Sequence, residues 1–348
     1  MSFRVSSRFL VLTLALATVV SGCAPTVAVN EGGTPESDNT VILYSGREEA
    51  LVQPLIDIFT EQTGITVEVR YNGTPELAAQ LLEEGEKTRA GVFLSQDAGA
   101  LGALSDAGLF EPLPAEISDR VRPKFSSLDA SWVGITGRAR VIVYDSQSVS
   151  PEDLPQSADD LLDPKWSGKI AVAPGNASFQ SFVTAYRVLK GESAGDEWVA
   201  GLVANSPHIF EKNSAILEAV NDGTHPLGLI NHYYWFQLAN ERGKENMRAQ
   251  LHFTEAGDPA SIVNVTGAGI LRPQRLDQDA YDLVAFLVSD QAQQYFVENT
   301  FEYSLVPGLG TPEGLPALED LAVATFDLSD LRSIAKTQSL LQKYGLIP

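Results

Sequence analysis

From Asn39 onward, short apolar segments alternate with segments of helical periodicity, and this alternation constrains the fold more than any other feature of the chain. The apolar segment "TVILYSG" precedes "EEALVQPLIDIFTEQTG", in which Leu51, Leu55 and Phe59 recur at helical spacing before Gly64. The next segment, "ITVEVRY", alternates apolar and polar residues as a strand does. A strand, a helix and a strand in this order predict an α/β sheet covered by helices on both faces.

A second series of such segments follows from about residue 133. It contains the apolar segment "GITGRARVIVYD", strands in "KIAVAP" and "PLGLIN", and helices in "ASFQSFVTAYRVLKG" and "NSAILEAVNDG". Further along, "SIVNVTGAGIL" predicts another strand, and "DQDAYDLVAFLVSDQAQQYFVEN" predicts one long amphipathic helix. In the first series, Thr74 is expected to cap a helix that has Pro75 at its first position.

Two strands that cross between the two series predict two lobes joined by strand-like hinges, with a cleft between them. Each lobe is expected to be a mixed sheet flanked by helices. We expect lobe 1 to comprise residues 40–137 and 264–315, and lobe 2 to comprise residues 138–263 and 316–348.

The first 22 residues carry the features of an export signal. An apolar run follows two arginines, and it is shorter than a membrane span requires. The sequence "VSGC" is similar to the lipobox of bacterial lipoproteins, which predicts a lipid anchor on Cys23 and a polar tether over residues 23–39. An ordinary signal with an incidental cysteine is the alternative. Cys23 is the only cysteine, so an internal disulfide and a cysteine-ligated metal site are excluded.

The charge of the chain argues against binding to nucleic acid. The formal net charge is −21, and removal of residues 1–22 takes away Arg4 and Arg8 and no acidic residue, which leaves −23. A surface of this charge repels phosphate backbones and anionic headgroups. The chain also lacks the G-x-S-x-G, P-loop and H-E-x-x-H motifs, and its four histidines have no ligand spacing. We therefore do not expect an enzyme.

The stretch "GLINHYYWFQL" places Tyr233 and Tyr234 next to each other. Neighbouring residues of a strand point to opposite faces, whereas in the first turn of a helix they are about 100° apart and can converge on one point. Two such phenols form either an aromatic cluster in the core or a pair of ligands, and the sequence leaves both interpretations open. As ligands they suit a hard, highly charged ion such as Fe³⁺, because only such an ion deprotonates a phenol with a pKa near ~10 at neutral pH.

Several segments in one order, which cover nearly everything after residue 39, resemble a known family. They are "LYSGREEALVQPLIDIFTEQTGITVEVRY", "LAAQLLEEGEKTRAGVFLSQDAGALGALSDAGLFEPLP", "WVGITGRARVIVYD", "DPKWSGKIAVAPGNASFQSFV", "LINHYYWFQLA", "DPASIVNVTGAGIL" and "EYSLVPG". The chain resembles the ferric-ion-binding proteins of bacterial iron(III) ABC transporters, members of the two-lobed type II periplasmic-binding-protein superfamily. This resemblance implies that Tyr233 and Tyr234 bind Fe³⁺ as phenolates.

The resemblance also implies a synergistic anion, phosphate or carbonate, that completes the coordination of the metal. The anion-binding positions of the family correspond here to Asn176, Ala177, Ser178, Asn213 and Asn231. The segment "GNASFQSFV" supports this, because a helix N-terminus offers free backbone N–H groups. Considered alone, Asn176 and Asn213 are N-caps of helices, and the two roles are compatible.

Lobe 1 departs from the family pattern. Where phosphate-using members have a histidine and a glutamate, this chain has Glu48 and Gln96. We expect Glu48 to be a metal ligand or, alternatively, a solvated acid at a helix start, and Gln96 to act indirectly through a water or the anion. Arg138 is a further candidate for the anion, with a structural salt bridge as the alternative, and Arg47 is a weaker one.

These features predict an extracytoplasmic, monomeric protein, lipid-anchored to the cell membrane, that captures Fe³⁺ with an anion between two lobes. It is expected to deliver the ion to an ABC permease with its ATPase. The alternative is a binding protein of the same fold for sulfate, thiamine, a polyamine or a phosphonate.

Overall fold

The computed structural model describes residues 39–255, 257–274, 277–321 and 328–348. The expected signal, Cys23 and all but the last residue of the tether lie outside these residues. Among the helices of the described ranges, none has the length and apolarity needed to cross a bilayer.

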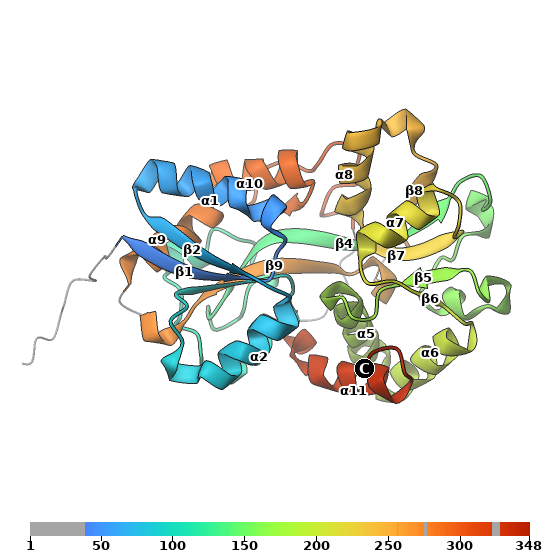
Figure 1. Cartoon of the computed structure of the whole chain (residues 1–348), viewed down its shortest axis with the longest axis horizontal. Coiled ribbons are helices and arrows are strands. Elements are labelled where there is room, and N and C mark those ends of the chain that lie inside the picture. Colours follow the sequence, from blue (N-terminus) through green and yellow to red (C-terminus); the bar gives the residue numbers. More distant parts are fainter. Residues whose placement is uncertain (1–38, 256, 275–276, 322–327) are drawn as a thin grey trace, which may run out of the picture. The chain divides into compact units, whose positions relative to one another are not determined.

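The chain begins with the expected alternation of strands and helices (Figure 1). Its first elements are β1 (Thr40–Ser45), α1 (Glu49–Thr63), β2 (Thr66–Tyr71), α2 (Thr74–Glu84), β3 (Val92–Ser95), α3 (Ala98–Asp106) and α4 (Ala115–Ser118). The middle of the chain forms β4 (Val133–Asp145), β5 (Ile170–Val172), α5 (Ala177–Lys190), α6 (Glu192–Ala204), β6 (His208–Ile209), α7 (Asn213–Asn221), β7 (Leu227–Asn231), α8 (His232–Arg242) and β8 (Ala249–His252). The last elements are β9 (Val263–Ile270), α9 (Gln278–Leu287), α10 (Asp290–Tyr295), the π-turn η9 (Phe296–Thr300), β10 (Tyr303–Ser304), the 3₁₀ segment η10 (Leu328–Ser333) and α11 (Ile334–Lys343).

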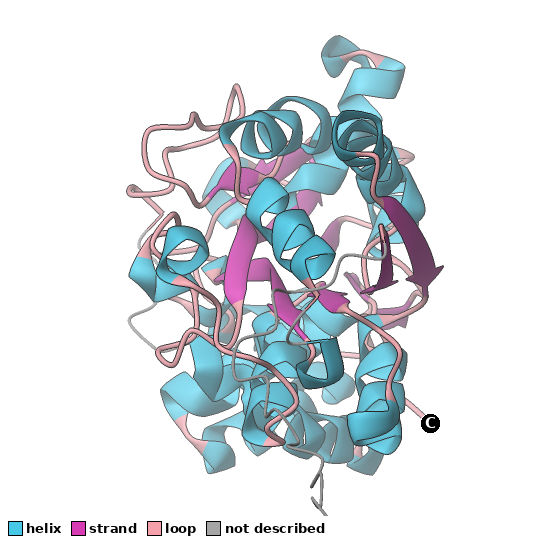
Figure 2. Ribbon diagram, turned by 90° about the vertical axis from the view of Figure 1, so that its left-hand side faces the viewer, coloured by secondary structure: helices cyan, strands magenta, loops and turns pink. Residues whose placement is uncertain are grey.

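The strands of the described ranges form one connected mixed sheet, with helices on both sides of it (Figure 2). The strand order is β2-β1-β3-β9-β4-β7-β5-β6, and β8 and β10 pair in addition with β4. Strand β1 is parallel to β2 and β3, β5 is parallel to β6 and β7, and the pairs that involve β4 or β9 are antiparallel.

Strand β4 belongs to both halves of the sheet. Residues Val133–Ala139 pair with β9, whereas Arg140–Tyr144 pair with β7. This exchange of partners shows that β4 runs from one half of the sheet into the other, whereas β9 pairs only with β3 and with the first part of β4. It supports a boundary near residue 138, and we retain lobe 1 and lobe 2, with the bounds given above, as a proposal.

Two apolar clusters form the core, and the larger one also includes residues of α7, β7 and α8 from the second half of the sheet, such as Leu217, Ile230 and Leu238. One cluster packs α1, α3 and α9 against β1, β3 and β9 through residues such as Leu55, Leu101 and Leu283. The other packs α5 and α6 against β5 and β7, with Phe182 and Trp198 in edge-to-face contact at 5.1 Å. Helix α11 packs on α5 and α6, so the C-terminal segment covers the second core.

Helix boundaries follow the expected signal at the end of α1 but differ from the expected ones at the start of α2 and after Asp277. Helix α1 ends at Gly64, whose φ of 75° is the left-handed conformation that favours glycine. Helix α2 is capped by Gly73, and Thr74 is its first residue, so the expected cap was wrong by one position. The expected long helix after Asp277 is broken into α9, α10 and η9, because Ser289 caps α10 by accepting a hydrogen bond from the Ala292 N–H.

Candidate functional site

Tyr233 and Tyr234 lie in the first turn of α8, as the sequence predicted, directly after β7 ends at Asn231. Their rings are stacked, with centroids 4.2 Å apart and an interplanar angle of 29°. The side chains are 1% and 6% exposed, respectively, and Tyr234 lines a cleft while Tyr233 lies behind it. Burial, followed by the proximity of Tyr233 and Glu48, raises the pKa of Tyr234 well above its ordinary value of 10. A ligand that needs the phenolate must therefore displace a tightly held proton.

The cleft has a volume of about 580 Å³ and is lined from both proposed lobes. The lobe 1 wall comes from the loops after β1, β2 and β3, and the lobe 2 wall comes from the starts of α5, α7 and α8. Six candidates from the sequence meet here: Arg47, Glu48, Gln96, Asn176, Ala177 and Tyr234.

A hydrogen-bond network holds the start of α5. The Asn176 side-chain oxygen caps the helix by accepting from the Ser178 N–H at 3.0 Å, and it also accepts from the Ser178 hydroxyl at 2.7 Å. The Ser178 hydroxyl in turn accepts from Asn213 Nδ2 at 3.1 Å and from Arg140 Nη1 at 3.1 Å. The Asn176 side-chain oxygen and the Ser178 hydroxyl thus fix the helix start through bonds within the wall.

Asn213 and Asn231 lie behind the cleft wall. Asn213 is buried and is the first residue of α7, whose cap is Lys212, so the expected cap was again displaced by one position. Asn231 is buried and precedes α8 without a side-chain cap bond. Lys212 lines the cleft beside the start of α5 and brings a cation to this wall.

The lobe 1 wall is more open. Glu48 is exposed and occupies the cap position of α1 without a side-chain hydrogen bond to the helix. Gln96 is partly exposed, and its backbone N–H donates to the Thr74 hydroxyl at 2.9 Å. Glu49, Glu76 and Glu211 also line the cleft, so carboxylates outnumber the two cations among its lining residues.

Besides Arg140, two further buried arginines, Arg47 and Arg138, lie near the tyrosines. Arg138 Nη2 donates to the Val265 carbonyl at 3.3 Å, and its Nε lies 3.9 Å from a carboxylate oxygen of Glu302. Burial, followed by repulsion from Arg47, lowers the pKa of Arg138. Burial alone would also lower the pKa of Arg47, but Glu302 and the two tyrosines outweigh it and raise that pKa. Arg138 thus lies against Glu302 and outside the cleft lining.

Comparison with known proteins identifies the family. Residues 87–328 match the family described as bacterial extracellular solute-binding proteins. The chain belongs to this family. Its members are binding proteins that act outside the cytoplasm, which agrees with the class expected from the sequence.

Relatives of this solute-binding protein are named for ferric iron. The Fe(3+)-binding periplasmic protein of Serratia marcescens is 32% identical over 348 residues, which cover the whole of both chains. The crystal structure of iron-bound HitA from Pseudomonas aeruginosa is 32% identical, with a TM-score of 0.84 over 88% of this chain and 99% of that one. A Trichodesmium protein in complex with iron and citrate is 27% identical, with a TM-score of 0.72 over 88% of this chain and 99% of that one. These neighbours confirm the expected type II periplasmic-binding-protein fold.

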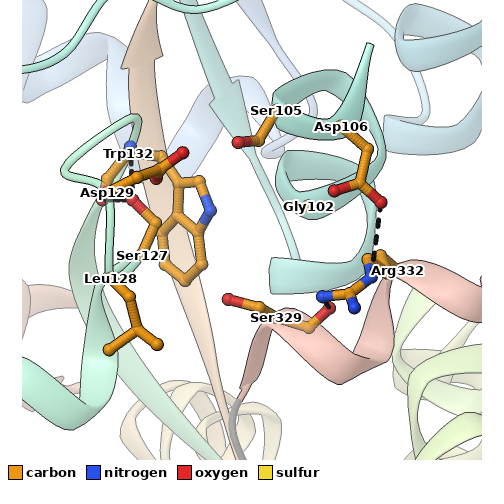
Figure 3. Close-up of a pocket in the computed structure, with 9 residues that line it drawn as sticks. All are labelled: Gly102, Ser105, Asp106, Ser127, Leu128, Asp129, Trp132, Ser329 and Arg332. Atoms are coloured by element: carbon orange, nitrogen blue, oxygen red, sulfur yellow. Dashed lines mark hydrogen bonds and ion pairs between the residues drawn. The ribbon is translucent and has the colours of Figure 1, made fainter. Parts of the chain in front are cut away.

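A second pocket of this solute-binding protein, of about 260 Å³, shares no lining residue with the cleft (Figure 3). It lies between α3, η10 and the segment Ser127–Trp132, and none of the expected site residues lines it. Its arginine, Arg332, is paired with Asp106 at 3.3 Å. Within the described ranges, no group of three or more His, Cys, Asp or Glu side chains is placed to hold a metal.

Sequence reasoning missed several residues of the site. Glu302 is a buried acid that contacts Arg47 across 255 positions of sequence, and no local pattern reveals such a contact. Glu211 and Lys212 also line the cleft. They directly precede the expected helix at Asn213, and this position could have indicated their place in the site.

Proposed function

We propose that this solute-binding protein captures Fe³⁺ in the cleft, with Tyr233 and Tyr234 as phenolate ligands, and delivers it to an ABC permease with its ATPase. The observation that carries the proposal is the pair of stacked phenols at the start of α8, one of which lines the cleft. The names of the relatives from Serratia marcescens and Pseudomonas aeruginosa support ferric iron as the cargo.

Charge balance favours a hard trivalent ion in this cleft. Two phenolates and the carboxylate of Glu48 together neutralise a 3+ ion, and Glu48 lies close enough to Tyr234 to affect its pKa. Glu48 is exposed, so its side chain is free to turn toward the metal from lobe 1. We propose an indirect role for Gln96, through a water or the anion, because an amide is a weak partner for Fe³⁺.

We further propose that a synergistic anion, phosphate or carbonate, binds at the starts of α5 and α7. The N-terminus of α5 faces the cleft through Ala177, and the ammonium of Lys212 lies on the same wall. Asn176, Ser178 and Asn213 hold this wall in place through their mutual hydrogen bonds, and Asn231, which makes no side-chain cap bond to α8, is a further candidate for the anion. Arg138 remains a candidate because its Nε and Nη1 groups are buried without hydrogen-bond partners in the described part of the chain. The Trichodesmium structure with iron and citrate shows that an anion accompanies iron in one relative.

The protein is proposed to act as a monomer that carries no catalytic activity. It is held at the outer face of the cell membrane by a lipid on Cys23. Ligands that contact both lobes favour the closed arrangement, because only that arrangement satisfies them together.

A visible absorption titration tests the proposal. Adding chelated Fe³⁺ to the wild-type protein is expected to produce a phenolate-to-iron charge-transfer band, and the variant Tyr233→Phe/Tyr234→Phe is expected to stay colourless. The matched control is Tyr71→Phe, which removes another phenol from the cleft lining, one that donates to Gln53 at 2.8 Å, and this variant should keep the colour. A colourless wild-type protein at saturating iron would contradict the iron proposal. Calorimetry with sulfate, thiamine, spermidine and a phosphonate would then test the alternative cargoes.

Repeating the titration with phosphate or carbonate as the sole anion identifies the anion. The expected result is that one of the two strengthens iron binding. Iron binding that is as strong without either anion as with them would contradict the anion site.

A further inference from the structure

Arg47 and Glu302 form a buried ion pair directly beside the tyrosines. Arg47 Nη2 lies 2.9 Å from Glu302 Oε1, and the two side chains are 2% and 0% exposed. The guanidinium carbon of Arg47 lies 5.4 Å from the centroid of the Tyr233 ring. Glu302 also accepts a hydrogen bond from the Thr300 hydroxyl at 3.0 Å, which fixes the carboxylate. Arg47 is therefore held in one orientation against Tyr233.

The loop that carries Arg47 is itself fixed. The Arg47 N–H donates to the Ser45 hydroxyl at 3.2 Å, and that hydroxyl donates back to the Arg47 carbonyl at 3.3 Å. Gly46 lies so close to the start of α2 that a Cβ there would be 1.9 Å from Thr74 Oγ1. Its N–H also donates to the Leu94 carbonyl at 2.8 Å. The position of Arg47 is thus set by the backbone of lobe 1.

The segment that carries Glu302 also contacts the helix that carries the tyrosines. His232, the first residue of α8, donates from Nε2 to the Phe301 carbonyl at 2.8 Å, and its Nδ1 accepts from the Ala139 N–H at 3.0 Å. The Phe301 ring stacks on Phe236 of α8 with centroids 5.7 Å apart. A displacement of Glu302 would therefore move both Arg47 and the start of α8.

We propose that Arg47 is a positioning residue of the iron site, held by Glu302 so that its guanidinium stabilises the Tyr233 phenolate and ties lobe 1 to the loaded lobe 2. This inference rests on the proposed function. Arg47 belongs to proposed lobe 1 and Tyr233 to proposed lobe 2, so the contact exists only when the lobes are close together. A phenolate attracts the guanidinium more strongly than a neutral phenol does, so iron binding strengthens a contact that keeps the cleft closed.

A purely structural role for the pair is the competing explanation, in which Arg47 serves only to neutralise Glu302. A fixed cation also repels the bound metal ion, but the carboxylate of Glu302 offsets most of that repulsion. The two roles differ in their spectroscopic consequence. In the charge-transfer transition an electron moves from the phenolate to the iron. A cation beside the phenolate lowers the energy of that electron, so removal of the cation shifts the band to longer wavelength.

The test uses the full-length protein and two variants. Arg47→Lys retains the charge and a partner for Glu302 but loses the planar fork. Arg47→Met/Glu302→Gln removes both charges and so leaves no unpaired buried carboxylate, but it also takes the Glu302 carboxylate away from Arg138, so thermal unfolding first checks that the variant is folded. The control is Arg248→Met/Asp145→Asn, which removes another arginine–carboxylate pair, one whose members do not line the cleft. Each iron-loaded protein is measured for the position of the charge-transfer band and for the rate at which a competing chelator removes the iron.

The inference predicts a band shifted to longer wavelength and iron loss roughly tenfold faster in the double variant, an intermediate result for Arg47→Lys, and wild-type behaviour in the control. A wild-type band and release rate in the double variant would overturn the inference and leave the iron proposal intact. A wild-type protein that shows no band would overturn both. If the double variant fails to fold, Arg47→Lys decides alone, because a wild-type band and rate in that variant exclude a role for the guanidinium fork.

Discussion

The two walls of the cleft are built differently. On the lobe 2 wall, Tyr234 and Asn176 belong to helix starts that buried hydrogen bonds hold in place, and Arg140 supports them from behind. On the lobe 1 wall, Glu48 is exposed and makes no bond to the helix that it precedes. The lobe 2 wall is therefore preorganised, whereas the lobe 1 wall presents a side chain that must be ordered when a ligand arrives.

From this difference we expect an order of capture. The ordering cost of a preorganised wall is met during folding, so we expect this wall to bind the metal first and most tightly. An exposed carboxylate adds little until the lobes close over the ion. Arg47 is the exception on lobe 1, because its ion pair with Glu302 holds the guanidinium in one orientation.

The largest effect is expected from Tyr234→Phe. This substitution removes a phenolate from the preorganised wall while the ring stays stacked on Tyr233. Loss of a metal ligand should cost more than loss of a supporting residue, so we expect iron affinity to fall by at least about a hundredfold. Competition with a chelator of known affinity, read by absorbance, measures the change. An affinity within threefold of wild type would place the metal elsewhere and reverse the comparison between the walls.

The preorganised wall was largely predictable from the sequence, because its signals are local. The segment "GNASFQSFV" contains its own cap, Asn176, and the helix start after Asn231 follows from the change from an apolar strand to a polar segment. The two adjacent tyrosines at that start could be recognised as candidate ligands without knowledge of the fold. No local pattern indicated that this helix start and the one at Asn213 belong to the same site. The family resemblance did.

The surroundings of Tyr233 were not predictable, because they depend on contacts between distant parts of the chain. Arg47 was a weak anion candidate, yet in the structure it pairs with Glu302, which the sequence did not single out. The break between α9 and α10 is a different kind of error. Ser289 carried a local cap signal, but the apolar periodicity on both sides of it favoured one continuous helix.

A matched pair of glycine substitutions tests how rigid each wall must be. Gly46→Ala places a Cβ 1.9 Å from Thr74 Oγ1 and 3.1 Å from Thr74 Cα, so the loop with Arg47 and Glu48 must shift. We expect a loss of about 2 kcal/mol in the free energy of unfolding, together with weaker iron binding. On the opposite wall, a Cβ at Gly175 meets no atom within 4 Å, and Gly175→Ala should change stability by less than about 0.5 kcal/mol. Chemical denaturation measures both, and equal effects would show that the lobe 1 loop tolerates displacement.

Acid should change the stability of the fold in opposite directions through two aspartates, Asp97 in the first half of the sheet and Asp145 at the end of β4. Burial raises the pKa of Asp97, which follows β3. Burial would also raise the pKa of Asp145 at the end of β4, but hydrogen bonds from Arg248 and from Ser148 dominate and lower that pKa to about 2. The folded state thus binds protons at Asp97 more readily, and at Asp145 less readily, than the unfolded chain does. Asp145 therefore contributes stability above pH ~3.8 that is lost as the pH falls toward ~2, whereas protonation of Asp97 favours the folded state.

For Asp145 we expect a contribution of about 1 kcal/mol above pH ~4, since Arg248 is partly exposed and solvent screens the pair. Thermal unfolding from pH 2 to pH 5 should show this loss in the wild type and a shallower dependence in Asp145→Asn. Asp97→Asn should instead remove the stabilisation of the folded state that protonation of Asp97 provides as the pH falls. Identical pH profiles for the wild type and Asp145→Asn would show that the ion pair with Arg248 carries no net stability.

The smallest effect is expected from Glu48→Ala, and it tests the lobe 1 wall most directly. The side chain is exposed and makes no cap bond, so the free energy of unfolding should change by less than about 0.5 kcal/mol. If Glu48 turns toward the metal only after closure, the cost of ordering it offsets much of what the carboxylate contributes, and iron affinity should fall by roughly threefold. The charge-transfer band should shift slightly, because a negative ligand of the iron has been lost. Glu49→Ala, a neighbouring acid of the cleft lining, serves as the control and should leave the band unchanged. A hundredfold loss in Glu48→Ala would instead make Glu48 an equal partner of the tyrosines and show that an exposed side chain can contribute as much as the preorganised wall.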